Sequence, residues 1–118
     1  MKKGSSALLL RIYVSSTDRC DEGLVYETLV FKAKKAGLAG ANVSKGILGF
    51  GASSVIRSYK FWEISEKLPV TIEFVDGEDK ILAFYQSIEP LLEAMKYGCL
   101  AITEKITVMQ YKPGKKRR

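Results

Sequence analysis

The chain has 118 residues, of which 47% are hydrophobic and 27% charged, a composition typical of one globular domain. This composition excludes an intrinsically disordered chain. A domain of this length buries enough surface to fold without a disulfide or a metal. The net charge is +6, but segment 112–118 carries five of those positive charges, which leaves +1 for residues 1–111. Such a basic segment serves solubility or contacts RNA or anionic lipid.

Three further features of the composition limit the chemistry. The chain has no histidine, which excludes Ser-His and Cys-His nucleophile pairs and nearly every catalytic zinc site. Cys20 and Cys99 match no zinc spacing and are predicted to be reduced structural thiols. The apolar stretch that ends before Arg11 is far shorter than the ~20 residues of a membrane helix and lacks a cleavage site. We therefore expect a cytoplasmic protein that does not insert into membranes.

The first half of the chain predicts a strand, a helix and a second strand. Alternating apolar residues indicate a strand over Ala7–Val14, and an apolar stripe with helical spacing indicates a helix from about Leu24 to Ala36. Residues 15–18 offer oxygens that could cap this helix, and Gly37 could end it in the left-handed conformation. The second strand is predicted over Asn42–Phe50.

After a long connection over Gly51–Leu68, the second half repeats the pattern. A strand is predicted over Val70–Val75, directly after Pro69. Pro90 falls inside the following helix and predicts a kink or a division there. The last strand is predicted from Leu100 to about Tyr111. The stripe that indicates the helix consists of Ile81, Phe84, Tyr85, Ile88, Leu91 or Leu92, and Met95.

This order predicts an α+β, ferredoxin-like βαββαβ fold, a four-stranded antiparallel sheet with both helices on one face. The domain would span residues 7–111, between a flexible segment 1–6 and a disordered basic tail 112–118. The other sheet face would have no helix over it. A partly apolar face of this kind predicts a contact between subunits. Its predicted members are Leu9, Arg11, Tyr13, Thr71, Glu73, Val75, Thr103, Lys105, Thr107 and Met109.

A glycine-rich segment at the end of the second predicted strand is the best candidate for a binding site. Glycines allow the backbone to approach a ligand closely, and successive amides can surround an anion. Hydroxyl groups and cations nearby would favour a phosphate or a carboxylate; alternatively, the glycines only shape the strand end. The candidate residues are Lys45, Gly46, Gly49, Phe50, Gly51, Ser53, Ser54 and Arg57, with Lys60 as a further cation.

Other residue clusters give weaker indications of chemistry. Two acidic clusters, Asp18 with Asp21 and Glu22, and Asp76 with Glu78 and Asp79, could bind a metal, but their positions at the two predicted helix starts are sufficiently explained by helix capping. The aromatic residues Tyr59, Phe61 and Trp62 could stack on a base or pack against a neighbouring subunit. An RNA-recognition module would have aromatic residues at the centres of its first and third strands, where this chain has only Tyr13. Nucleic acid is therefore not the expected partner.

Four segments together resemble a known family. They read YETLV at 26–30, AGLAGANV at 36–43, GILGFGASS at 46–54 and LPVTIEFVD at 68–76, and Lys80-Ile81 follows them. In this order they are similar to the family called domain of unknown function 190, a relative of the PII signalling proteins. The similarity covers nearly all of residues 7–111.

The resemblance implies a ferredoxin-like subunit in a PII-like homotrimer, with residues 51–68 in the place of the T-loop, which contacts target proteins. It also implies an adenine nucleotide as a candidate ligand, in the clefts between subunits, and a target such as a membrane transporter or channel. The chain departs from the family in two places. Arg57 stands where histidine is common, and Lys45 stands where arginine is frequent, which removes a two-pronged grip on phosphate.

The leading hypothesis is therefore a non-enzymatic sensor, with no required cofactor, that binds a small anion and changes a partner contact through residues 51–68. One alternative is a small ferredoxin-like enzyme that uses Glu63, Glu66 or Lys60 for proton transfer. Another is a trimeric metal-responsive protein, or a nucleic-acid binder that works through its basic tail.

Overall fold

The structure is a computed structural model that describes residues 1–51, 57–58 and 67–115. For residues 57 and 58 it describes the backbone alone. The expectations for Ser53 and Ser54, and for the aromatic, acidic and basic residues within 59–66, therefore lie outside the described residues. So do the last three positions of the basic segment, 116–118.

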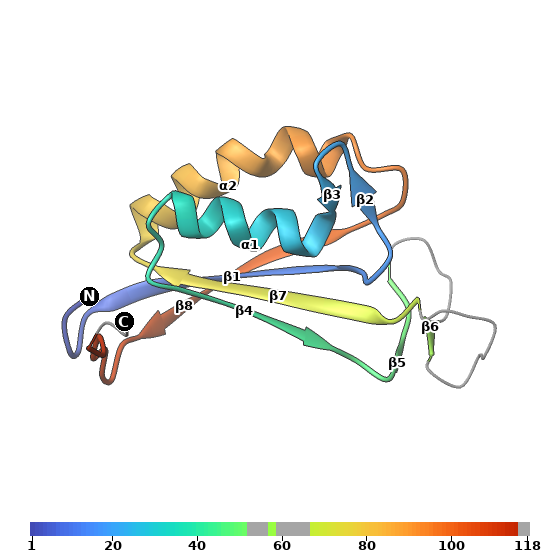
Figure 1. The fold of residues 1–118 in the computed structure, drawn as a ribbon. Coiled ribbons are helices and arrows are strands. Elements are labelled where there is room, and N and C mark those ends of the chain that lie inside the picture. Colours follow the sequence, from blue (N-terminus) through green and yellow to red (C-terminus); the bar gives the residue numbers. More distant parts are fainter. Residues whose placement is uncertain (52–56, 59–66, 116–118) are drawn as a thin grey trace.

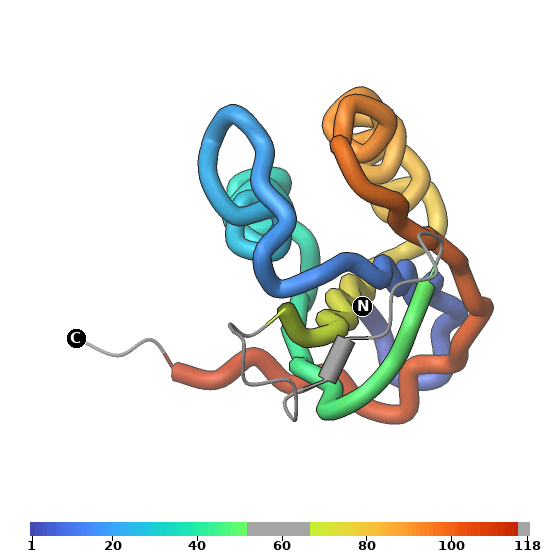
Figure 2. Tube along the Cα trace, turned by 90° about the vertical axis from the view of Figure 1, so that its right-hand side faces the viewer, coloured from blue at the N-terminus to red at the C-terminus, as the bar shows by residue number. Residues whose placement is uncertain are grey.

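A four-stranded antiparallel sheet, in the order β4-β7-β1-β8, forms one layer of the domain. Both helices cover the same face of this sheet and lie side by side above it (Figures 1 and 2). This arrangement confirms the predicted ferredoxin-like fold. The sheet strands are β1 (Ser6–Ser15), β4 (Gly40–Lys45), β7 (Pro69–Asp76) and β8 (Leu100–Thr107), and the helices are α1 (Val25–Lys35) and α2 (Glu78–Glu93).

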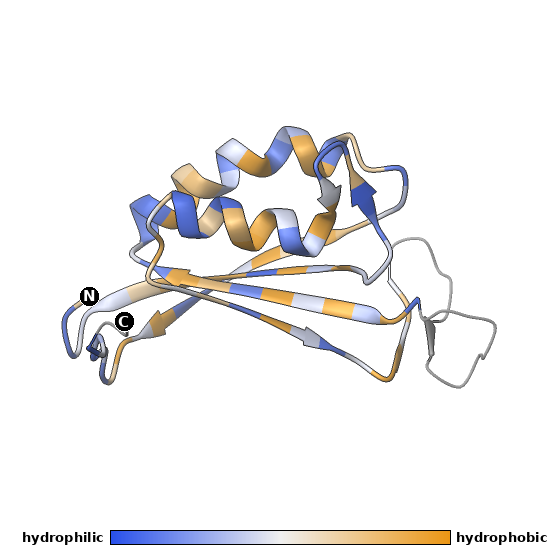
Figure 3. Ribbon diagram, viewed as in Figure 1, coloured by the Kyte–Doolittle hydropathy of each residue, from blue (hydrophilic) through white to orange (hydrophobic). Residues whose placement is uncertain are grey.

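The hydrophobic core lies between the sheet and the two helices. Every second residue from Leu8 to Val14 of β1 and from Val70 to Phe74 of β7 is buried in it. The alternating hydropathy of β7 can be followed in Figure 3. The Phe74 ring is completely buried and contacts Phe84 of α2 at a centroid distance of 5.0 Å. Among the described residues, the helices cover only this one face of the sheet, and no other layer lies over the opposite face.

The turn before α1 differs from the prediction. A short hairpin of β2 (Arg19–Cys20) and β3 (Gly23–Leu24) precedes the helix, and no side chain caps the helix at Leu24. The buried Asp18 instead holds the turn after β1, because its carboxylate accepts a hydrogen bond from the Ser15 amide (2.8 Å) and its carbonyl accepts one from the Val25 amide (2.9 Å). Side-chain capping by this acidic cluster was therefore the wrong interpretation.

Asp76 joins the C-terminal turn of α1 to the start of α2. Its carboxylate accepts hydrogen bonds from the amides of Ala39 (2.9 Å) and Gly77 (2.6 Å). The Lys80 ammonium lies 3.7 Å from the same carboxylate and donates to the Gly37 carbonyl at 2.7 Å. Gly37 has a φ of 79°, which confirms the predicted left-handed end of α1.

Three predicted element boundaries need correction. The second strand ends at Lys45 rather than Phe50, because the chain turns at Gly46 and residues 48–49 form β5 (Leu48–Gly49), which pairs with β6 (Arg57–Ser58). The last strand ends at Thr107 rather than Tyr111. Helix α2 continues through Pro90 to Glu93 without a division.

The side-chain alternation of the last strand was predicted one residue out of step. Residues paired across an antiparallel ladder share a face, and β8 pairs Leu100 with Tyr13 and Ile102 with Arg11. Leu100, Ile102 and Glu104 therefore lie on the uncovered face, whereas Thr103, Lys105 and Thr107 lie on the helix side. The error arose because β8 is an edge strand whose residues are mostly exposed, so its sequence shows no clear alternation.

The uncovered face carries a charged group beside an apolar one. The Arg11 guanidinium of β1 lies 2.9 Å from the Glu73 carboxylate and 3.4 Å from the Glu104 carboxylate. These carboxylates come from β7 and β8, the two strands that flank β1. Tyr13, Leu100 and Ile102, all exposed in the single subunit, lie next to this charged group, and Ile102 is paired directly with Arg11. Over the described ranges, no helix is long and apolar enough to cross a membrane.

Candidate functional site

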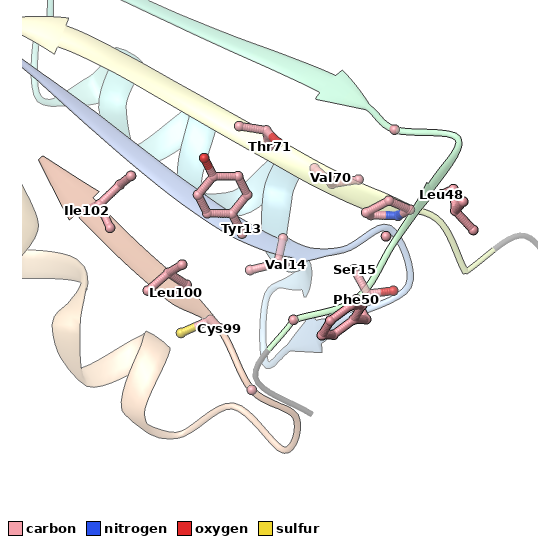
Figure 4. A pocket seen from close by; sticks show the side chains of 15 residues that line it. Tyr13, Val14, Ser15, Leu48, Phe50, Val70, Thr71, Cys99, Leu100 and Ile102 are labelled. Atoms are coloured by element: carbon pink, nitrogen blue, oxygen red, sulfur yellow. The ribbon is translucent and has the colours of Figure 1, made fainter. Parts of the chain in front are cut away.

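One end of the uncovered face leads into a pocket of about 680 Å³. Four segments form its walls: the end of β1, the start of β7, the turn 46–51, and residues 98–102 at the start of β8 (Figure 4). The lining residues are Tyr13, Val14, Ser15, Gly46, Leu48, Gly49, Phe50, Gly51, Pro69, Val70, Thr71, Gly98, Cys99, Leu100 and Ile102.

The glycines of the turn allow it to pack closely on β7. The Gly46 amide donates a hydrogen bond to the Pro69 carbonyl at 2.7 Å, and a Cβ atom on Gly46 would lie only 3.0 Å from Pro69 Cγ. A Cβ atom on Gly49 would lie 3.4 Å from the same atom. Neither glycine has a positive φ. These glycines therefore allow the turn to pack closely against Pro69. This packing places Leu48 and Phe50 in the lining of the pocket.

The structure brings together only part of the predicted site. Gly46, Gly49, Phe50 and Gly51 line the pocket, but Lys45, the last residue of β4, does not. The Arg57 backbone pairs with Gly49. Among the described lining residues none is charged, so the polar groups are hydroxyls, one thiol and backbone atoms.

Sequence reasoning did not assign Tyr13, Thr71, Leu100 and Ile102 to this site. Tyr13 and Thr71 were expected on the uncovered face, but nothing in the sequence shows that the turn 46–51 lies beside them. Leu100 and Ile102 were missed because of the error in the alternation of β8. The strand register brings all four side chains to one face, where they make the pocket largely apolar.

The metal hypothesis finds no centre in the described part of the chain. Within residues 1–51 and 67–115, no group of three or more His, Cys, Asp or Glu side chains is close enough to hold a metal ion. Glu22 forms an ion pair with Lys32 (3.3 Å), and Glu73 pairs with Arg11. Glu63, Glu66 and Lys60 lie outside the described residues.

Cys99 lies in the pocket wall as a half-buried thiol. Burial raises the pKa of this thiol, and the negative charge of Asp18 raises it further. We therefore expect Cys99 to react with iodoacetamide several-fold more slowly in the folded protein than in urea, because the thiolate is the reactive form. The difference between the two reaction rates should become smaller as the pH rises past the pKa of Cys99 in the folded protein. Mass spectrometry of the Cys99 peptide over time measures both rates, and equal rates at mildly alkaline pH would contradict this assignment.

The fold is the one found in PII-like proteins of known structure. The structure of CPII from Thiomonas intermedia K12, bound to ADP and bicarbonate, matches with a TM-score of 0.69 at 15% identity and covers 92% of this chain and 93% of that one. A PII-like signalling protein from Thermus thermophilus matches with a TM-score of 0.63 at 18% identity, over 91% and 93% of the two chains. These structural similarities establish the fold.

The chain belongs to the DUF190 family ("Uncharacterized ACR"), whose model matches residues 7–108. This confirms the resemblance inferred from the four sequence segments. A UPF0166 protein of Aquifex aeolicus is 37% identical over 81 residues, which cover 69% of this chain and 77% of that protein. A UPF0166 protein of Methanocaldococcus jannaschii is 37% identical over 99 residues, covering 83% and 88%.

Proposed function

We propose that this protein is a PII-like sensor that assembles as a homotrimer and binds an adenine nucleotide at the pocket. Its output would be a contact between residues 51–68 and a target protein. The observation that carries this proposal is the pocket itself, an apolar hollow of about 680 Å³ beside the uncovered sheet face.

The lining of the pocket favours an aromatic ring over a bare anion. Tyr13, Phe50 and Leu100 offer apolar surface, while Thr71 and backbone groups offer hydrogen bonds. Such a combination is typical of small-molecule sites, in which a few polar groups orient a mostly buried ligand. The phosphates would need cations, which Arg57 and Lys60 of the connection 51–68 would supply.

The solved relatives support the choice of ligand. The matching structures of CPII hold ADP, AMP and bicarbonate as bound molecules. That protein shares the fold at 15% identity, so the ligand class is transferred as a proposal and tested directly.

The uncovered face supports the trimer. Tyr13, Leu100 and Ile102 are 36%, 52% and 37% exposed in the single subunit, on the side of the sheet without helices. Contiguous apolar residues of this kind mark contacts between proteins. Contact between copies through this face would also deepen the pocket at its rim, so that the ligand would lie between subunits.

Isothermal titration calorimetry with ATP, ADP and AMP, each with and without bicarbonate, tests the ligand. We expect saturable binding of at least one nucleotide. Thr71→Trp should fill the pocket and abolish that binding, whereas Thr103→Trp, on the helix side of the sheet, should retain it. Absence of heat with every nucleotide in a folded oligomer would overturn the nucleotide assignment, and equal binding by the two variants would overturn the pocket.

A further inference from the structure

We infer that Asp18, buried behind the pocket wall, makes the pocket prefer a purine base that carries an amino group to one that carries a carbonyl group. This inference rests on the proposed nucleotide binding and goes beyond it, because it names the residue that decides which base is accepted. Asp18 does not itself line the pocket. It acts through the residues that do, so its role is to set the electrostatic potential at the wall.

Asp18 is a buried carboxylate without a nearby counter-charge. The residue is 5% exposed, and its Oδ2 atom accepts a hydrogen bond from the Ser15 amide at 2.8 Å. Its backbone is also held, because its amide donates to the Ser15 carbonyl (3.1 Å) and its carbonyl accepts from the Val25 amide (2.9 Å). Over the side chains that the structure describes, no lysine or arginine forms an ion pair with Asp18. One amide dipole therefore faces a full negative charge.

This charge acts on the pocket at two lining residues. Ser15, whose amide bonds to the Asp18 carboxylate, is one of them, and Cys99 is the other (Figure 4). Burial raises the pKa of the Cys99 thiol, and the negative charge of Asp18 raises it further. Electrostatic interactions are stronger in a protein interior than in water, because little solvent is present to screen them. The wall formed by Ser15 and Cys99, which we call the Asp18 wall, therefore has a negative potential.

No cation in the lining offsets this potential, since none of the described lining residues is charged. A negative potential favours a hydrogen-bond donor on the ligand and disfavours an acceptor or an anion. Adenine carries an amino group, which is a donor, at the position where guanine carries a carbonyl oxygen, which is an acceptor. Hypoxanthine has the same carbonyl group as guanine. We therefore expect the amino group of adenine to face the Asp18 wall and the phosphates to lie away from it.

Calorimetric titration with AMP and with inosine monophosphate (IMP), whose base is hypoxanthine, tests this inference. The native protein should bind AMP more tightly than IMP. Asp18→Asn removes the charge but keeps a side-chain oxygen that can accept from the Ser15 amide. It should reduce the preference for AMP over IMP on the order of 3- to 10-fold. The matched control is Asp21→Asn, which makes the same chemical change at an exposed residue of the same hairpin and should leave the preference unchanged.

Alkylation of Cys99 at a series of pH values shows whether the charge was removed at the wall of a folded pocket. Asp18→Asn should shift this profile to lower pH, and Asp21→Asn should not. An unshifted profile in Asp18→Asn would overturn the inference, because the charge would not act on the wall. Binding of AMP with an unchanged preference would overturn this inference alone. Absence of binding by both nucleotides would overturn the proposed function as well.

The inference would also fail if the native protein bound IMP as tightly as AMP. In that case the pocket would accept a purine by its apolar surface without distinguishing the amino group from the carbonyl group.

Discussion

The substitution Leu100→Asp is expected to convert the assembly into monomers and to abolish nucleotide binding. Leu100 pairs with Tyr13 on the uncovered face, and half of its surface is exposed in the single subunit. In the proposed trimer that surface becomes buried, so each subunit would have to bury an unpaired carboxylate. Removing such a charge from water costs several kcal/mol without a compensating partner.

The control for this prediction uses the same strand and the same charge. Thr103→Asp changes an exposed residue three positions along β8, on the helix side of the sheet. Light scattering combined with size-exclusion chromatography should report a trimer for Thr103→Asp and a monomer for Leu100→Asp. A trimer in both variants would show that this face is not the contact, and a monomeric native protein would refute the trimer itself.

Phe74→Ala is expected to lower the free energy of unfolding by about 3–5 kcal/mol. The Phe74 side chain is completely buried between the sheet and α2, where its ring contacts Phe84. Its removal leaves a cavity between two layers that cannot both move inward, so the lost burial and the lost contacts add together.

Phe31 on α1 is the matched control, because its side chain is 70% exposed. Phe31→Ala should change stability by less than about 0.5 kcal/mol. Urea unfolding at one fixed protein concentration compares the three proteins, since subunit association would otherwise shift the midpoint. Similar losses for both variants would contradict the position of the core.

The regular alternation of β1 and β7 made the central part of the fold predictable. Both strands bury every second residue, and the predicted and observed members of the core agree. Gly37 was predictable for a local reason, because a left-handed residue after a helix favours glycine whatever surrounds it. The cap of α1 was not, because the Asp18 carboxylate accepts a hydrogen bond from the Ser15 amide and only the Asp18 backbone carbonyl bonds to the helix that follows.

Only the part of the site that comes from a single continuous segment was predictable from the sequence. The turn with Gly46, Gly49 and Phe50 was identified from its composition, since close backbone approach needs glycine. The opposite wall, with Tyr13, Thr71 and Leu100, comes from three strands, and their register decides which side chains face the turn. A shift of one residue in the predicted alternation of β8 was enough to conceal two lining residues, Leu100 and Ile102.

The sequence by itself determined the order of strands and helices, the buried faces of the two central strands and the family, because periodicity and local motifs encode them. The tertiary structure alone decided the pairing of Leu100 with Tyr13, the exclusion of Lys45 from the pocket and the hydrogen bonds of Gly4 and Ser5 with Val108. These relations join residues far apart in the chain, and only the hydrogen-bonded register of the sheet fixes them.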